Sequence, residues 1–437
     1  MLAPKGRSLL LFSRDLRVHD HPALHAAALD GEVLALFVLD ERILGADSVG
    51  ANRIVFLLDS LHELRYSLRA LGAELIVRRG DPVAIAQGLM IQHGITRIRM
   101  SRDSTPYARM RSSRLEEVVR AIEGELLLSP GITILDPDLL RTGGGTHYQI
   151  FTPYYRTWQR ARRRELLSPP GEIVALAGVD AGTIPTFDEL CAGADPIGER
   201  VFPPLFKEPF SPGRAPGGES VALMLLQRFL AGGAEQYLLA SNQLGEEGTS
   251  LLSAHLHFGT LSAALFEWEL SALANAGAEA AIRQLCWREF YHALLSGNPR
   301  ITRENFRERS TPWRRDDAEL AAWRRGETGV DLVDAAMRQL LKEGFMHNRA
   351  RLVVASYLTK DMGHHWSEGA RHFARWLSDA DVACNVGNWQ WMAGTGNDTR
   401  PNRRLSPQRQ AERFDADGRY RARYLSTTSA QEQLRLL

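Results

Sequence analysis

The hydrophobic pattern of this chain changes once along its length, and that change limits the possible folds more than any other feature. Up to about residue 140, short apolar runs alternate with longer stretches of helical periodicity, whereas after residue 218 the pattern is helical almost to the end. Strands that alternate with helices predict a parallel sheet covered on both faces. We therefore expect a Rossmann-like α/β domain over residues 1–140, a connector over 141–218 and an all-α domain over 219–437.

Five apolar runs and three helical stretches alternate in the first of these parts. A ligand of nucleotide type is expected at the carboxyl ends of such strands, but no Gly-x-Gly-x-x-Gly follows the first run to indicate a dinucleotide. The charges of residues 13–17, SRDLR, either line that crevice or form a solvated turn, and we favour the solvated turn. The expected strands are residues 8–12, 33–39, 74–78, 97–100 and 132–135, and the expected helices are 51–71, 82–93 and 107–122.

The second part carries apolar stripes at three- and four-residue spacing, which predict helices. The stripe in 331–343 is the clearest, with Gly344 as its stop signal. Residues 168–218 are instead rich in Pro and Gly, and we expect them to run over a surface. The expected helices are 219–232, 261–275, 278–296 and 331–343.

Charge and cysteine usage narrow the class of protein. A net charge of +1 argues against a uniformly basic nucleic-acid binder but leaves room for a local basic face. Cys191, Cys286 and Cys384 lie far apart without metal-ligand spacing, so we expect reduced thiols and no metal site. The N-terminus meets charge again after a short apolar run, which predicts neither a signal peptide nor a membrane span. We therefore expect a cytoplasmic protein with no membrane partner.

The segment Asp379–Trp391, DADVACNVGNWQW, combines acids, amides and indoles in thirteen residues. Carboxyl and carboxamide groups among indoles suit a buried polar ring system, which needs hydrogen bonds on its edges and π-contacts on its faces. The alternative is a helix capped by Asp379 or Asp381 and packed by two core tryptophans.

Residues 247–262 place Thr249, Ser250 and Ser253 around a turn just before a helix. Hydroxyls and free backbone N–H groups at a helix N-terminus suit a phosphate or pyrophosphate. The alternative is a helix N-cap with spare hydroxyls.

Residues 284–295 set Gln284, Trp287 and Tyr291 on one face of a helix. A carboxamide beside an indole can read a base edge while the ring stacks. An amphipathic helix with a core tryptophan is the alternative interpretation.

Residues 345–352, FMHNRARL, bring several basic and polar side chains together. Arg351 is the natural partner for Asp379 or Asp381, because a buried acid needs a counter-charge. The alternative is a solvated basic helix end.

The order of these segments is more specific than any one of them, and it resembles the photolyase/cryptochrome flavoproteins. The matching motifs are GTSLLSAHLHFG, QLCWREFY, the W-x-x-G-x-T-G of Trp323–Gly329, LVDAAMRQL, GFMHNRARL and DADVACNVGNWQW, with SRDLRVHDHPAL and FTPYYRTW nearer the N-terminus. The chain is most similar to the class I photolyases that repair cyclobutane pyrimidine dimers (CPDs). The resemblance implies a monomer that binds FAD in a U shape within the helical domain and acts on UV-damaged DNA.

The same resemblance implies which residues bind FAD. Asp379, Asp381 and Asn385 match positions on the isoalloxazine edge, with Asn385 beside N5, and Arg351 matches the arginine that pairs with Asp379. The positions around the phosphates and ribitol are matched by Tyr237, Thr249, Ser250, Leu251, Leu252 and Ser253.

The resemblance also implies an electron path and a pocket for a flipped-out dimer. Trp389, Trp366 and Trp313 match three tryptophans that pass electrons from the surface to photoexcited flavin, with core packing as the alternative. Trp287 and Trp391 match the aromatic pocket walls. The remaining substrate and DNA positions are matched by Asn348, Arg349, Leu352, Arg403 and Gln410.

Phosphate contacts are expected from a basic run after the flavin segment. This run contains Arg400, Arg403, Arg404, Arg409 and Arg413, and a second cluster contains Arg156, Arg160, Arg162, Arg163 and Arg164. We assign the DNA backbone to the first group, because it lies close in sequence to the expected pocket.

The chain departs from the family pattern at several positions. Gln284 stands where dimer photolyases carry a Glu that is thought to protonate the dimer, and an amide cannot give up a proton at neutral pH. Tyr107 and Ala108 stand where folate binders have Asn and Glu, so a deazaflavin is favoured over folate as antenna, or none binds. Other replacements are Leu352 for Met, Ser241 and Leu251 for Arg, and Ser406 for Asn.

The expected function is light-driven repair of CPDs by electron transfer from excited, reduced FAD, the activity of a deoxyribodipyrimidine photo-lyase. The alternative is a cryptochrome-like blue-light photoreceptor with weak or no repair, which Gln284 and the lost arginines favour. A nucleic-acid-binding flavoprotein with neither activity is a third hypothesis. The (6-4) specificity is not expected, because Asn348 and Leu352 occupy the positions of its two histidines.

Overall fold

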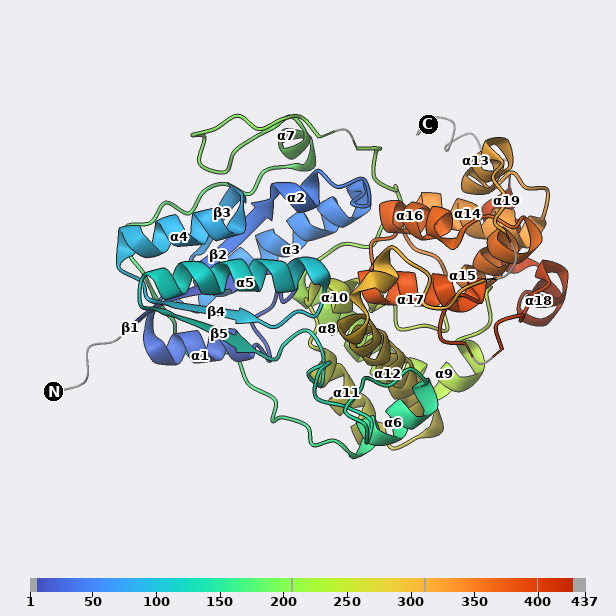
Figure 1. Ribbon diagram of the computed structural model, residues 1–437, viewed down its shortest axis with the longest axis horizontal. Helices are drawn as coiled ribbons and strands as arrows, with labels where there is room; N and C mark the ends of the chain where they lie inside the picture. Colours follow the sequence, from blue (N-terminus) through green and yellow to red (C-terminus); the bar gives the residue numbers. More distant parts are fainter. Residues whose placement is uncertain (1–5, 206, 310–311, 399, 427–437) are drawn as a thin grey trace.

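The computed structural model describes residues 6–205, 207–309, 312–398 and 400–426. It contains an α/β domain with a parallel sheet, followed by a helical domain packed against it (Figure 1). The expected fold class is therefore confirmed. The prediction that the N-terminus is not a signal peptide rests partly on residues 1–5, which lie outside the described residues. Within the described ranges, every helix is too short or too polar to cross a membrane.

All strands of the sheet run parallel, in the order β3-β2-β1-β4-β5. Four of the five apolar runs are strands, as predicted. The order in which the chain adds strands reverses between β1 and β4, and this is the switch point where such sheets bind ligands. The strands are β1 (Gly6–Phe12), β2 (Gly31–Asp40), β3 (Leu75–Gly80), β4 (Arg97–Ser101), β5 (Glu125–Ser129) and the short β6 (Val174–Ala175), which pairs with β2.

The predicted strand at 132–135 is wrong, because the fifth strand lies earlier, at Glu125–Ser129. The buried carboxylate of Glu289 accepts from the backbone N–H groups of Ile134 and Leu135, at 2.9 and 3.2 Å. These N–H groups therefore cannot donate to a neighbouring strand of the sheet. Both side chains pack in the core of the helical domain. An apolar run that fills a neighbouring core has the same pattern as a buried strand.

Helices cover both faces of the sheet, as the alternation of side chains along β1 requires. Leu10 and Phe12 point toward α1 and α3, whereas Leu9 and Leu11 point toward α4 and α5. The helices are α1 (Pro22–Asp30), α2 (Glu41–Leu44), α3 (Ala51–Ala70), α4 (Pro82–His93) and α5 (Pro106–Ala121).

The chain between the sheet and the helical domain contains α6 (Phe151–Arg160), β6 and α7 (Phe187–Cys191). Part of it runs along the outside of the α/β domain (Figure 1). Arg79 of β3 holds this part by donating to the carbonyl oxygens of Leu190 and Ala194, at 3.0 and 2.8 Å. The Pro-rich sequence therefore forms a surface strap that is anchored to the sheet.

The second half of the described chain is helical, and the predicted helices are present. Gly344 ends α14 in the left-handed region, with φ of 60°. The helices are α8 (Glu219–Arg228), α9 (Ala234–Ala240), α10 (Ser253–Phe258), α11 (Ala263–Leu273), α12 (Ala276–Gly297), α13 (Asp317–Arg325), α14 (Asp331–Glu343), α15 (Asn348–Ser356), α16 (Trp366–Trp376), α17 (Val382–Ala393), α18 (Pro407–Phe414) and α19 (Arg419–Leu425), with short 3₁₀ or π segments at Phe229–Gly233, Pro299–Thr302 and Tyr357–Asp361.

Candidate functional site

A cavity of about 560 Å³ lies within the helical domain. Its walls come from α9, α10, α12, α15 and α17, together with the loop before α17. A second, smaller cavity of about 80 Å³ adjoins it. The two share seven lining residues: Asn348, Arg351, Leu352, Asp379, Asp381, Cys384 and Asn388.

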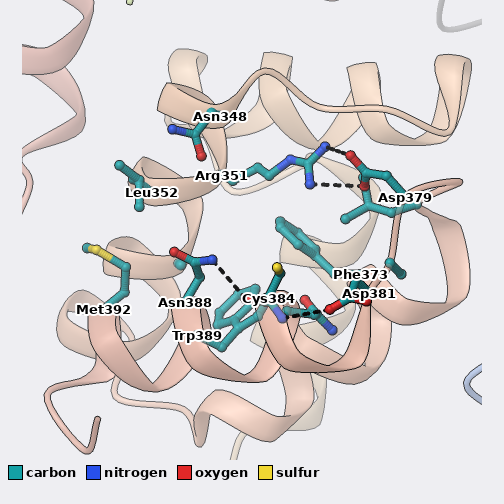
Figure 2. A pocket seen from close by; sticks show the side chains of 14 residues that line it. Asn348, Arg351, Leu352, Phe373, Asp379, Asp381, Cys384, Asn388, Trp389 and Met392 are labelled. Carbon is teal, nitrogen blue, oxygen red and sulfur yellow. Dashed lines mark hydrogen bonds and ion pairs between the residues drawn. The ribbon is translucent and has the colours of Figure 1, made fainter. Parts of the chain in front are cut away.

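Asp379 and Arg351 form the predicted ion pair on the inner wall of the cavity. The guanidinium nitrogens of Arg351 lie 3.0 and 2.8 Å from the two carboxylate oxygens, a bidentate arrangement. Figure 2 shows Arg351 reaching from α15 across the cavity to Asp379. Burial alone would raise the pKa of Asp379, but the charge of Arg351 holds it below its ordinary value. Asp379 is therefore an ionised hydrogen-bond acceptor.

Asp381 caps a helix, as one interpretation of this segment predicted, and it also lines both cavities. Its Oδ1 accepts from the backbone N–H of Cys384 at 3.0 Å and caps α17. Its Oδ2 accepts from Arg14 of the α/β domain at 2.6 Å, and His292 lies 3.3 Å away. Burial opposes ionisation, but these neighbours hold the pKa of Asp381 well below its ordinary value.

Asn385 and Trp389 line the smaller cavity from α17. The amide Nδ2 of Asn385 donates to the carbonyl oxygen of Ala370 at 2.8 Å, which fixes the orientation of the carboxamide. The ring of Trp389 packs against Gly369, where an added Cβ would lie only 2.1 Å from the indole. Glycine at this position therefore allows α17 to approach α16 closely.

The residues predicted around the phosphates divide into two groups. Tyr237, Ser250 and Ser253 line the larger cavity, whereas Thr249, Leu251 and Leu252 line neither cavity. Leu252 lies in the core, and Leu251 is partly exposed with φ of 57°. The turn thus directs its two serines to the cavity, and its hydroxyls are not the side-chain cap of α10.

Six of the residues predicted on the substrate side form the outer wall of the same cavity. Phe151 of α6 stacks on the indole of Trp287, with ring centroids 3.7 Å apart and an angle of 5°. Arg349 donates to Asn242 Oδ1 at 2.5 Å. The predicted residues in this wall are Gln284, Trp287, Asn348, Arg349, Leu352 and Trp391.

Of the three tryptophans of the predicted electron path, only Trp389 lines a cavity. Trp389 and Trp366 are buried, and the indole N–H of Trp366 donates to Asn305 at 2.7 Å. The imidazole of His365 contacts both Trp313 and Trp366, with ring centroids 4.9 and 5.3 Å away. Trp313 is partly exposed, and Trp366 and Trp313 line neither cavity.

The two arginine clusters differ in how much of their charge faces solvent. Arg163 is bound to Glu267 at 2.7 Å, and Arg164 is paired with Asp20, so both are structural. Arg403 in the C-terminal run is exposed and lies over the ring of Trp391, 5.0 Å from its centroid. This contact joins the exposed basic run to the outer wall. Gln410 lies in α18 and, like Arg403, lines neither cavity.

The expectation that SRDLR forms a solvated turn is wrong. Arg17 is 1% exposed and donates to carbonyl oxygens of Gly259 and Gly131, at 2.9 and 3.0 Å. Arg14 binds Asp103 at 2.9 Å as well as Asp381. Arg14 and Asp103 follow β1 and β4, so this charge cluster fills the switch point of the sheet.

Several lining residues were not among the predicted site residues. Most of them carry little sequence signal, because apolar and imidazole side chains at helical spacing also fit an ordinary core. His257 is one of them, and burial lowers its pKa to about 4, so it is neutral near pH 7. These residues include Phe229, Asn242, Leu256, His257, Phe266 and Arg288.

The cavity fits a large nucleotide cofactor. Its volume of about 560 Å³ lies within the range of small-molecule sites. Ionised acids and an amide line its inner end, hydroxyls line another part, and indoles flank its mouth. The protein is thus a parallel α/β domain joined to a helical domain whose cavity can hold a nucleotide-sized ligand.

Comparison with known proteins identifies the family. The model for DNA photolyase matches residues 8–171, and that for the FAD binding domain of DNA photolyase matches 281–434. The deoxyribodipyrimidine photo-lyase of Streptomyces griseus is 41% identical over 416 residues, covering 94% of this chain and 88% of the relative. The chain belongs to the DNA photolyase family.

Solved structures agree with this assignment. A bacterial class III photolyase from Agrobacterium tumefaciens superposes with a TM-score of 0.84 and 29% identity, covering 97% of this chain and 87% of that one. A cryptochrome from Synechocystis sp. PCC6803 gives a TM-score of 0.85 and 27% identity, with coverages of 97% and 89%. Both branches of the family thus share this fold.

Proposed function

We propose that this chain is a deoxyribodipyrimidine photo-lyase that uses FAD and light to split cyclobutane pyrimidine dimers in DNA. One arrangement carries the proposal: a single cavity has an ion-paired acidic inner wall and an outer wall of indoles that adjoins an exposed arginine run. The inner wall suits the polar edge of a flavin, and the outer wall suits flipped-out bases.

The proposed roles follow from the side chains. Asp379 and Asp381 would accept hydrogen bonds from the edge of the isoalloxazine, and Asn385 would offer an amide near N5. Ser250, Ser253 and Tyr237 would bind the polar remainder of the cofactor. When bound, FAD supplies the light-driven electron donation that opens the dimer.

On the outer wall, Trp287 and Trp391 would stack on the displaced bases, and Asn348 and Arg349 would bind their polar edges. Gln284 would donate a hydrogen bond to the dimer without giving up a proton. Arg403 and its neighbours would bind phosphates, which positions the duplex without reading its sequence.

The test is a repair assay on FAD-loaded, reduced protein with ultraviolet-irradiated DNA, under blue light and in the dark. Loss of dimers only in the light is the expected result. A protein with full flavin occupancy that leaves dimers unchanged, or one that cannot be loaded with FAD, would contradict the proposal.

A second candidate function is blue-light reception of the cryptochrome kind, and the amide at Gln284 favours it. The two functions differ in DNA binding rather than in photochemistry. A repair enzyme binds dimer-containing DNA more tightly than undamaged DNA at one stated salt concentration. Equal affinity for the two DNAs would favour the photoreceptor.

We also propose that the α/β domain, residues 1–140, binds a deazaflavin rather than folate if it holds an antenna. Tyr107 supports this, because it stands where folate binders have an Asn. Its hydroxyl donates instead to Asp40 at the carboxyl end of β2. The connector at 141–218 would then join it to a catalytic domain at 219–437. The protein would act as a cytoplasmic monomer.

A further inference from the structure

Residues 374–381, which are the last turn of α16 and the loop before α17, carry both acids of the inner wall, yet the α/β domain holds them in place. Asn52 of α3 donates to the carbonyl oxygen of Trp376 at 2.6 Å. Arg53 donates to the carbonyl oxygens of Ala374 and Ala380, at 2.9 and 3.3 Å. The backbone of this segment is therefore bound from outside its own domain.

The contact between α3 and this segment is also sterically close. An added Cβ at Gly50, the N-cap of α3, would lie 1.6 Å from the carbonyl oxygen of Arg375. Only glycine allows this approach, and Figure 1 shows α3 on the side of the α/β domain that faces α16. The N-terminus of α3 is thus fitted against the loop that enters the cavity.

Arg14 of the α/β domain also binds this segment, through the side chain of Asp381. Its guanidinium binds Asp103 through Nε and Nη2, at 2.9 and 3.1 Å, and Asp381 through Nη1 at 2.6 Å. The side chain of Asp381 is 6% exposed, so water contributes little to its solvation. One carboxylate oxygen is fixed by the cap of α17, and the other is bound by Arg14, with His292 3.3 Å away.

We propose that Arg14 is a positioning residue of the FAD site, which acts through Asp381 and makes the α/β domain part of that site. Arg14 lines neither cavity, whereas Asp381 lines both. The bridge to Asp103 anchors the guanidinium on the sheet, so the docking of the domains sets the direction of the Asp381 carboxylate. This inference rests on the proposed binding of FAD.

A double-mutant cycle tests the proposal, with the dissociation constant for FAD measured by fluorescence titration of the full-length apo-protein. The variants are Arg14→Gln, Asp381→Asn and the two combined. Asn caps a helix as well as Asp does, so Asp381→Asn removes the charge and leaves the start of α17 intact. Arg7→Gln is the control, because Arg7 pairs with Glu32 on the surface of the same domain at 2.8 Å.

Arg14→Gln is expected to raise the dissociation constant for FAD about 30-fold, and Arg7→Gln to change it by less than about twofold. The combined variant is expected to bind FAD no more than about threefold more weakly than Asp381→Asn alone, because the two residues act as one unit. Effects that multiply would show that Arg14 acts elsewhere and would overturn the inference, as would unchanged affinity in Arg14→Gln.

If Arg14→Gln does not fold, Arg14→Lys replaces it in the same cycle, with the same criterion of non-multiplying effects. A lysine keeps the charge but cannot bridge two carboxylates with a planar fork. Failure of the wild-type apo-protein to bind FAD would refute the proposed function itself. That outcome is distinct from wild-type binding with an unchanged Arg14 variant, which overturns the inference alone.

Discussion

The inner and outer walls of the larger cavity are built in opposite ways. On the inner wall, the carboxylates of Asp379 and Asp381 are buried, and each is paired with an arginine. On the outer wall, Gln284 and Asn348 are exposed, and Trp287 and Trp391 are half-buried. One wall is fixed before any ligand arrives, and the other is open to solvent.

The difference shows how one cavity can serve two binding partners. Preorganised ionised acceptors give a permanently bound cofactor one orientation, because their reorganisation has already occurred on folding. A substrate that enters and leaves needs stacking surfaces that are accessible. Damage to the inner wall should therefore affect stability and cofactor binding, and damage to the outer wall should affect only DNA.

Replacement of Arg351 is expected to have the largest effect. Arg351→Met leaves Asp379 as an unpaired buried carboxylate, which costs about 3–5 kcal/mol in the free energy of unfolding. Urea unfolding at pH 7 measures this change. The matched control is Arg371→Met, whose exposed pair with Glu368 is worth less than about 1 kcal/mol.

The pH dependence of the difference in free energy of unfolding between wild type and Arg351→Met gives a second check. The folded pKa of Asp379 is depressed, so the stabilisation by Arg351 is fully present above the unfolded pKa of about 4. It is lost as the pH falls through the folded pKa. The gap between wild type and Arg351→Met should therefore shrink on acidification, and a constant gap would contradict this account of the inner wall.

Replacement of Trp389 is the next largest test of the inner wall. Trp389→Phe removes an oxidisable ring beside the cavity and should slow light-driven reduction of bound flavin about a hundredfold, equivalent to about 2.7 kcal/mol in the barrier. Absorbance during illumination with an external reductant measures the rate. Trp376→Phe, which lies outside the proposed path, should leave it unchanged, and an unaltered rate in Trp389→Phe would remove Trp389 from its assigned role.

Much of the fold could be predicted from the sequence, because hydrophobic period reports which element a segment forms. Four strands and the long helices lie where their patterns indicated. The failure at 132–135 has a specific cause, since Glu289 lies far away in sequence and captures the backbone of that run. Local periodicity carries no information about such a partner.

The ion pair of the inner wall could be predicted from the sequence, but the contact that the α/β domain makes with this wall could not. An isolated acid pair needs a counter-charge, so Arg351 could be proposed for Asp379. Arg14 was assigned to solvent because a segment with three charged residues beside a strand usually forms a turn. Its burial depends on the docking of two domains, which no local pattern encodes.

Replacement of Trp287 tests whether the outer wall binds only DNA. Trp287→Ala removes a stacking face and should weaken binding of dimer-containing DNA by about 1–3 kcal/mol. The affinity for FAD and for undamaged duplex should remain unchanged, as measured by titration and by fluorescence anisotropy. Trp268→Ala is the control, because Trp268 is exposed on α11 and lines neither cavity. An equal loss of affinity for both DNAs would mean that Trp287 does not contact the displaced bases.

Replacement of Arg403 is expected to have the smallest effect. It tests whether Arg403 belongs to the basic run or to the outer wall. If Arg403 neutralises one phosphate, Arg403→Gln should lower the slope of log affinity against log salt by about 1 for damaged and undamaged DNA alike. Arg160→Gln is the matched control from the other arginine cluster and should leave the slope unchanged. A loss of affinity confined to dimer-containing DNA would instead place Arg403 in the pocket, since its guanidinium already lies over Trp391. The outer wall would then extend to Arg403, and the boundary between stacking and phosphate binding would need to be redrawn.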